Sequence, residues 1–135
     1  RLRAGRLEQI TRDHSWLQEQ IDAGLITQQQ AALSSSRNLV TRALGVEDDA
    51  LVEINEFKVE PQDLYLMCSD GLSEMVSHED LTALATAALP LEDKARRLID
   101  AANANGGRDN ISVVLVQAGT SESKRGFMSR LMRTA

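Results

Sequence analysis

DLYLMCSDGLSEMVS, residues 63–77, joins a nearly continuous apolar run to a polar stretch with an aspartate, a glycine and several serines. The run from Leu64 to Cys68 has the length and composition of a strand that is covered on both faces. Asp70 and Gly71 follow at the point where this strand would end. An acid in this place is explained either by a turn, which Asp-Gly favours, or by a metal ion that needs a carboxylate ligand.

A second aspartate lies at the start of another apolar run. In GGRDNISVVLV, residues 106–116, a glycine-containing loop leads to Asp109, and ISVVLV follows as a predicted buried strand. If the two strands run antiparallel, the end of the first lies beside the start of the second. Asp70 and Asp109 would then come close together, each on a loop held by a rigid strand.

Two carboxylates held together cost free energy unless one is protonated or a cation neutralises both. Mg²⁺ and Mn²⁺ are suited to this role because they prefer oxygen ligands and keep several waters. Glycines beside both acids would let the backbone approach such a site. Ordinary turns at Asp70-Gly71 and Asp109-Asn110 explain the same residues, so the local chemistry leaves both explanations open.

The remaining segments predict helices packed against a mostly antiparallel sheet, an α+β fold. Residues 1–11 are expected to form a hairpin with Ala4-Gly5 at its bend, and residues 50–60 alternate apolar and polar side chains as a half-exposed strand does. The polar residues 13–42 are expected to form a helical flap on the surface. The expected helices span about residues 15–23, 27–33, 77–87 and 91–103.

Composition narrows the class of protein. The 135 residues fit one domain, and 42% hydrophobic with 26% charged residues is typical of a globular protein. A net charge of −5 and four aromatic residues argue against a nucleic-acid partner. No apolar run approaches the roughly 18 residues of a transmembrane segment. One cysteine and no signal peptide indicate a cytoplasmic protein, and the start without Met indicates a piece of a longer chain.

Two nucleophilic mechanisms fit the sequence poorly. A cysteine phosphatase needs an arginine six residues after its nucleophile, but Glu74 stands there relative to Cys68, so Cys68 is expected to be a buried core thiol. An aspartyl-phosphate mechanism needs a second acid two residues after the first, where Leu72 follows Asp70. Asp70 is therefore better explained as a ligand than as a nucleophile.

A few polar side chains remain as secondary candidates. Arg37 and Arg42 border the flap and could bind a phosphopeptide, with ordinary surface arginines as the alternative. His14 and His78 are expected to be solvated surface side chains. The basic, partly apolar segment 124–133 could dock on a partner or an acidic membrane, although a flexible end is the preferred interpretation.

Several of these motifs together resemble a known family. YLMCSDGLSEMVS and GGRDNISVVLV resemble the C-terminal motifs of the metal-dependent serine/threonine protein phosphatases, the type 2C family, in its bacterial form. ITRDHSWLQEQIDAGLIT followed by RNLVTRALG is similar to the flap segment of that family. The resemblance runs from the hairpin to about Gln117, so residues 1–118 are expected to be the C-terminal part of a phosphatase domain and residues 119–135 a tail.

The resemblance implies a fold and an activity. The fold is a four-layer αββα sandwich with mostly antiparallel sheets, and Asp70 and Asp109 would be ligands of a binuclear Mn²⁺ or Mg²⁺ centre. Water activated by the metals would attack the phosphorus of phosphoserine or phosphothreonine. The partners would be phosphoprotein substrates of a serine/threonine kinase in a signalling circuit.

The resemblance covers only half of the family's pattern. The glycine-flanked bridging aspartate, the phosphate-gripping arginine and the GDSR-type strand of the family have no counterpart in these 135 residues. This chain is therefore expected to supply part of the metal shell and to be inactive alone. The alternative is a phosphatase-like module without catalysis, kept for binding or regulation.

Overall fold

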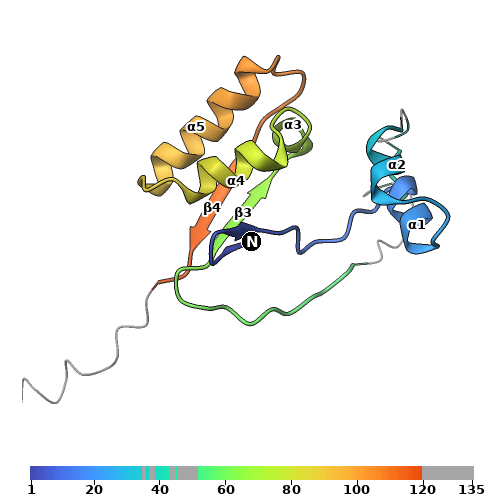
Figure 1. Cartoon of the computed structure of the whole chain (residues 1–135), viewed down its shortest axis with the longest axis horizontal. Helices are drawn as coiled ribbons and strands as arrows, with labels where there is room; N and C mark the ends of the chain where they lie inside the picture. Colours follow the sequence, from blue (N-terminus) through green and yellow to red (C-terminus); the bar gives the residue numbers. More distant parts are fainter. Residues whose placement is uncertain (35, 37–38, 43–44, 46–51, 120–135) are drawn as a thin grey trace, which may run out of the picture. The chain divides into compact units, whose positions relative to one another are not determined.

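The computed structural model describes residues 1–34, 36, 39–42, 45 and 52–119. Their backbone divides into two compact units, one containing residues 1–8 together with the chain from residue 58 onward, the other containing residues 9–57. Figure 1 shows the elements of each unit along the chain. Each unit is described by itself.

The first unit is built on an antiparallel sheet with the strand order β2-β1-β3-β4 in the described part of the chain. Its strands are β1 (Leu2–Arg3), β2 (Arg6–Leu7), β3 (Leu64–Cys68) and β4 (Val113–Gln117). β3 pairs with β4 over its whole length, from Leu64 opposite Gln117 to Cys68 opposite Val113. The end of β3 therefore lies beside the start of β4, as the sequence predicted for two antiparallel strands.

The β1–β2 hairpin turns at Ala4 and Gly5, as the sequence predicted. Both residues have positive φ, 49° and 78°, which is the backbone of the tight turn that matches the twist of paired strands. Glycine adopts this conformation without strain, whereas alanine is uncommon there. The hairpin places β1 beside β3, where Leu2 lies opposite Leu64.

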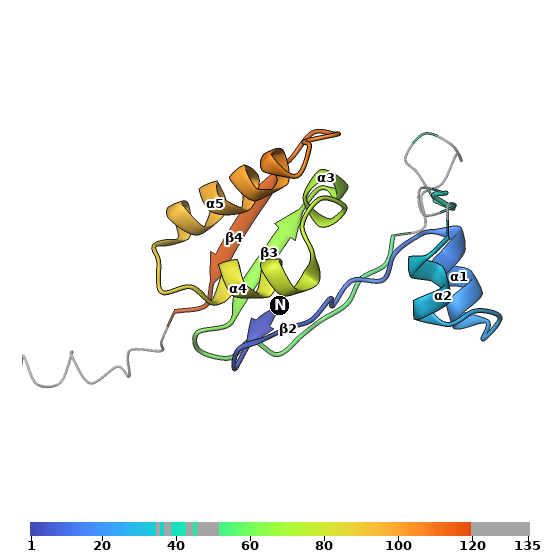
Figure 2. The same cartoon turned by 45° about the horizontal axis from the view of Figure 1, so that its top comes forward.

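Three helices follow β3: α3 (Asp70–Ser73), α4 (His78–Thr86) and α5 (Leu91–Ala104). In both views α4 and α5 lie on the same face of the sheet (Figures 1 and 2). Helix residues of this core include Leu72 and Leu98, neither of which has any exposed surface, and the sheet contributes Leu66, Val113 and Leu115. Burying a leucine contributes about 1.5–3 kcal/mol, so this layer of helices holds the sheet in place.

The opposite face of the sheet is uncovered in the described part of the chain. Met67 on β3 lies opposite Val114 on β4, and both side chains are more than half exposed. Val116, on the same face, is 48% exposed. The expectation that both strands are covered on both sides is therefore wrong for the described residues, because all the helices that pack on the sheet lie on one face of it.

The strand expected over residues 50–60 is not formed by the described residues 52–60, and Ala50 and Leu51 lie outside the described part. Val52 and Ile54 are about four-fifths exposed, at 78% and 82%. Alternating apolar residues form a strand only beside a neighbour with free backbone groups and over an apolar layer that the side chains can join. Among the described residues, none pairs its backbone with residues 52–57 in a strand or bridge.

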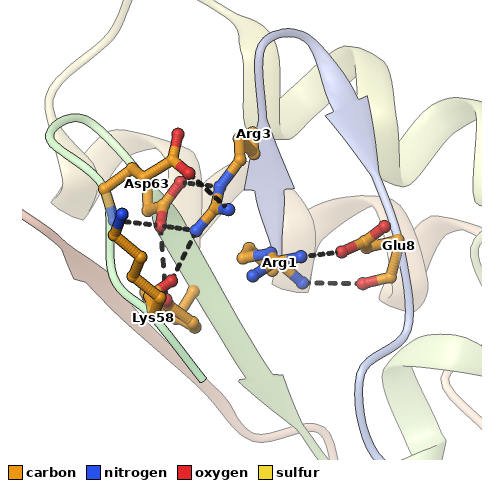
Figure 3. A network of polar contacts seen from close by, with 7 residues as sticks. Arg1, Arg3, Glu8, Lys58 and Asp63 are labelled. Atoms are coloured by element: carbon orange, nitrogen blue, oxygen red, sulfur yellow. Dashed lines mark hydrogen bonds and ion pairs between the residues drawn. The ribbon is translucent and has the colours of Figure 1, made fainter.

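A buried carboxylate ties the start of β3 to β1. The side chain of Asp63 is 1% exposed, and Arg3 donates to both of its oxygens, from Nε at 2.7 Å and from Nη2 at 2.6 Å (Figure 3). The same guanidinium reaches Glu60 Oε1 at 2.9 Å and the Lys58 carbonyl at 2.8 Å. The backbone N–H of Glu60 also donates to Asp63, at 2.8 Å. One arginine thus fixes the turn that precedes β3.

The second unit contains α1 (Trp16–Asp22) and α2 (Gln28–Ala32), close to the two helices predicted there. Ser15 caps α1 by accepting from the Gln18 N–H, and Thr27 and Gln30 form the expected capping box of α2. Its buried apolar residues include Leu17 and Ala31. A short antiparallel bridge joins residues 14–16 to residues 39–41 through the hydrogen bonds Trp16 N–H to Leu39 O and Thr41 N–H to His14 O, both 2.9 Å.

Asp63 makes stability depend on pH in a defined direction. The hydrogen bond from Arg3 holds the pKa of the Asp63 carboxyl well below its usual range. Its contribution to stability is therefore present above the unfolded-state pKa of about 4 and is lost as the pH falls below that value. We expect Asp63→Asn to lower the urea midpoint at pH 7 and to weaken the loss of stability between pH 5 and pH 3, roughly the range in which carboxylates titrate.

Asp100→Asn is the matched control, because Asp100 is an exposed carboxylate on α5 with no ion pair among the described residues. It should leave both the midpoint and its pH dependence close to those of the unchanged protein. Equal behaviour of the two variants would show that the Arg3–Asp63 pair does not hold the sheet.

Candidate metal site

The strand pairing brings the two predicted ligands to one edge of the sheet. Asp70 is the first residue of α3, two positions after the end of β3. Asp109 lies four positions before the start of β4. Beyond the last β3–β4 pair, the Ser69 N–H still donates to the Ser112 carbonyl, at 3.1 Å. The segments that carry the two acids therefore run side by side.

Gly71 marks the place where these segments touch. A Cβ atom at this position would lie 2.4 Å from the Asn110 carbonyl oxygen and 3.4 Å from the carbonyl carbon of Asp109. Real Cβ atoms do not approach other atoms as closely as the first distance. The residue after Asp70 thus packs directly on the backbone that carries Asp109, and only glycine leaves room for this contact.

Each carboxylate accepts one backbone hydrogen bond. Asp70 Oδ1 accepts from the Gly71 N–H at 2.9 Å, and Asp109 Oδ1 accepts from the Asn110 N–H at 2.7 Å. Both residues are exposed, and no lysine, arginine or histidine among the described residues forms an ion pair with either. The second oxygen of each carboxylate accepts no hydrogen bond from the described residues, so it can bind water or a cation.

The two carboxylates are the type of ligand that Mg²⁺ and Mn²⁺ prefer, but two of them are fewer than either ion needs. Both ions prefer carboxylate oxygens, and Asp70 and Asp109 offer them at a site open to solvent. In the described part of the chain, no group of three or more His, Cys, Asp or Glu side chains could hold a metal ion. The two aspartates alone therefore do not make up the full coordination of such an ion.

The other candidates lie elsewhere. His78 is exposed at the start of α4, and Arg42 is exposed near the end of the described flap, whereas Arg37 lies outside the described residues. The His14 ring lies 3.3 Å from a Glu53 carboxylate oxygen. Among the described residues, no hydrogen bond or ion pair links His14, His78 or Arg42 to Asp70 or Asp109, so the structure does not extend the site to them.

Cys68 corrects one expectation. The sequence predicts a buried thiol, but Cys68 is exposed, because it is the last residue of β3 and lies at the end of that strand. Partial burial of its sulfur, and to a smaller extent the charge of Asp70, raise the pKa of the Cys68 thiol. A raised pKa disfavours the thiolate, so the side chain is unsuited to act as a nucleophile, as the sequence also indicated.

Comparison with known proteins assigns the chain to a family. Residues 10–119 match the model of the family described as Stage II sporulation protein E (SpoIIE). The chain is 35% identical over 115 residues to the protein phosphatase PhpP of Streptococcus pneumoniae, covering 85% of this chain and 47% of that protein. It is 37% identical over 121 residues to the serine/threonine phosphatase stp of Listeria monocytogenes, covering 88% and 47%. The chain belongs to the type 2C protein phosphatase family.

Solved structures agree with this assignment. The Mycobacterium tuberculosis serine/threonine phosphatase PstP/Ppp superimposes with a TM-score of 0.76 at 38% identity, over 88% of this chain and 50% of that one. The serine/threonine phosphatase of S. agalactiae gives a TM-score of 0.79 at 32% identity, over 88% and 49%. The PstP catalytic domain has also been solved with two manganese ions, and it matches with a TM-score of 0.66. The α+β fold expected from the sequence is thereby confirmed.

The match is to a part of each type 2C relative. The chain spans about half the length of the curated relatives and of the solved chains that it matches.

One residue at the site was not among the sequence candidates. Ser69 precedes α3, where a serine is normally expected to cap the helix. Its hydroxyl instead contacts the segment that follows Asp109. Nothing in the sequence separates these two uses of a serine, because both place the same residue type before a helix.

Substitution of Gly71 should separate the two acid-bearing segments. Gly71→Ala places a methyl group against the Asn110 carbonyl, and overpacking of this kind costs about 1–3 kcal/mol of unfolding free energy. Urea denaturation followed by circular dichroism measures this loss. Gly119→Ala serves as the control, since a Cβ there would have no atom within 4 Å. Equal stability of the two variants would contradict the close contact.

Proposed function

We propose that this chain is the C-terminal part of a metal-dependent protein serine/threonine phosphatase. The observation that carries the proposal is that the backbone segments of Asp70 and Asp109 lie side by side at one end of the β3–β4 pair, with no ion pair to either acid among the described residues. Membership of a family whose relatives are named serine/threonine phosphatases supplies the reaction. Asp70 and Asp109 would each give one carboxylate to a Mn²⁺ or Mg²⁺ centre.

The chain's own residues have a positioning task in this reaction. The strand pairing and the Gly71 contact hold the backbone segments of Asp70 and Asp109 side by side, and in this proposal that arrangement would leave little ordering to accompany the binding of an ion. A bound ion would supply a water of lowered pKa and neutralise charge on the phosphoryl oxygens of phosphoserine or phosphothreonine. Because both acids are exposed, a phosphoprotein chain can reach this edge of the sheet.

Substrates and setting follow from the same proposal. The substrates would be phosphoproteins, the products of a serine/threonine kinase in the same cytoplasmic signalling circuit. Residues 13–42 would be the flap segment of the family, with Arg42, and Arg37 outside the described part, as candidate basic groups for a phosphopeptide. No helix in the described part is long and apolar enough to cross a membrane. Residues 120–135, which carry the expected tail, lie outside the described part.

The 135-residue chain alone should have no phosphatase activity. Two carboxylates do not complete an ion's coordination, and the described residues offer no third acidic, histidine or cysteine ligand in the same group. Hydrolysis of a phosphothreonine peptide, followed by phosphate release with and without Mn²⁺, tests this. Turnover of the chain alone at a rate typical of enzymes, about 1–1,000 per second, would contradict it.

In the longer protein that we propose carries this chain, Asp70→Asn and Asp109→Asn should each lower Mn²⁺-dependent activity by about 100-fold or more. Loss of a ligand removes several kcal/mol of charge stabilisation from the transition state, and about 1.4 kcal/mol corresponds to tenfold in rate. Asp100→Asn, an exposed carboxylate on α5, should leave the rate unchanged.

A non-catalytic phosphatase-like module is the alternative. It predicts that the longer protein binds a phosphopeptide but releases no phosphate at any Mn²⁺ concentration. It also predicts that the two aspartate variants bind the peptide as the unchanged protein does. That combination of results would replace the enzyme with a binding module.

A further inference from the structure

Ser69 lies at the N-terminal boundary of α3 but does not cap it. Its backbone has the extended conformation of a capping residue, with φ −75° and ψ 164°, yet its side chain makes no hydrogen bond to the helix. A serine in this position normally accepts from the N–H two or three residues later. Here the Leu72 N–H donates to the Ser69 carbonyl instead, at 3.1 Å. The hydroxyl is therefore directed away from the helix.

The hydroxyl of Ser69 joins the segment of Asp70 to the segment of Asp109. It donates to the Asn110 carbonyl oxygen at 2.7 Å and accepts from the Ser112 N–H at 3.0 Å. The Ser69 N–H also donates to the Ser112 carbonyl, so Ser69 makes three hydrogen bonds to the segment that follows Asp109. One contact is to the residue directly after Asp109, and Ser69 itself directly precedes Asp70.

We infer that Ser69 is a positioning residue that sets the spacing of the Asp70 and Asp109 carboxylates for the metal ion. This rests on the proposed function, because it concerns the same site. Two exposed carboxylates repel each other when no cation lies between them, and this repulsion acts to separate their segments. The Ser69 hydroxyl opposes the separation through its hydrogen bonds to Asn110 and Ser112. Residues that orient metal ligands in this way typically change metal affinity or activity 10–100-fold when replaced.

A purely structural role would give a different pattern. A neutral hydrogen bond lost from an exposed loop would lower the stability of the fold and leave metal affinity unchanged once the protein is folded. A positioning role acts on the affinity for the ion in the folded protein. Mn²⁺ affinity and stability without metal therefore distinguish the two roles.

The experiment uses the longer protein that carries this chain and measures Mn²⁺ binding by isothermal titration calorimetry and by the electron paramagnetic resonance spectrum of the bound ion. We expect Ser69→Ala to raise the dissociation constant about 10–100-fold and to broaden the spectrum of the bound ion. Ser69→Thr keeps the hydroxyl and should restore both the affinity and the spectrum. Urea denaturation without metal establishes that each variant is folded under the binding conditions.

Ser73→Ala is the matched control. The Ser73 hydroxyl lies on the same short helix, but its hydrogen bond goes to the Asp70 carbonyl, at 3.4 Å, and not to the segment of Asp109. It should bind Mn²⁺ as the unchanged protein does. If Ser69→Ala fails to fold, Ser69→Cys, whose sulfhydryl is a weaker donor, makes the same comparison with a smaller expected loss.

The aspartate variants separate failure of this inference from failure of the proposed function. If Asp70→Asn and Asp109→Asn weaken Mn²⁺ binding while Ser69→Ala matches Ser73→Ala, the metal site stands and the positioning role of Ser69 is wrong. If neither aspartate variant weakens Mn²⁺ binding, the metal site itself is wrong and the inference falls with it.

Discussion

The antiparallel pairing of β3 with β4 is the interaction on which the rest of the structure depends. It runs without a break from Leu64 opposite Gln117 to Cys68 opposite Val113, and Ser69 and Ser112 extend it by one hydrogen bond. On one face it offers the apolar surface on which the helices pack. At one edge it places Asp70 and Asp109 in neighbouring segments, so the same backbone contacts build both the core and the candidate site.

Local signals in the sequence predicted most of the elements correctly. The turn at Ala4-Gly5, the capping box of α2 and the helices α4 and α5 each depend on residues within a few positions of one another, and the structure contains them all, whereas the short helix α3 was not predicted. The strand expected over residues 50–60 and the two-sided burial of β3 were wrong. Whether a strand has a partner, or a sheet face has a cover, depends on segments distant in the sequence, which periodicity does not report.

At the candidate site, too, the sequence predicted some residues and missed one whose contacts are distant in the sequence. Asp70 and Asp109 could be proposed because acids at the ends of two apolar runs meet if the strands are antiparallel, and the register of β3 and β4 bears out that condition. Ser69 could not be proposed, since a serine before a helix is ordinarily a cap. Its hydroxyl reaches a segment more than forty residues away, to Asn110 and Ser112. Only the tertiary structure shows such a contact.

The unit of residues 9–57 is inserted between β2 and β3, and this has a consequence for how the family can vary. The Arg3–Asp63 pair connects the β1–β2 hairpin to the start of β3, and its two residues are sixty positions apart in the sequence. The entropy of closing a loop rises only slowly with its length, by about 0.6 kcal/mol for each doubling. Insertions and deletions in this segment should therefore cost the sheet little free energy, so its length can change while the sheet and the Arg3–Asp63 pair stay the same.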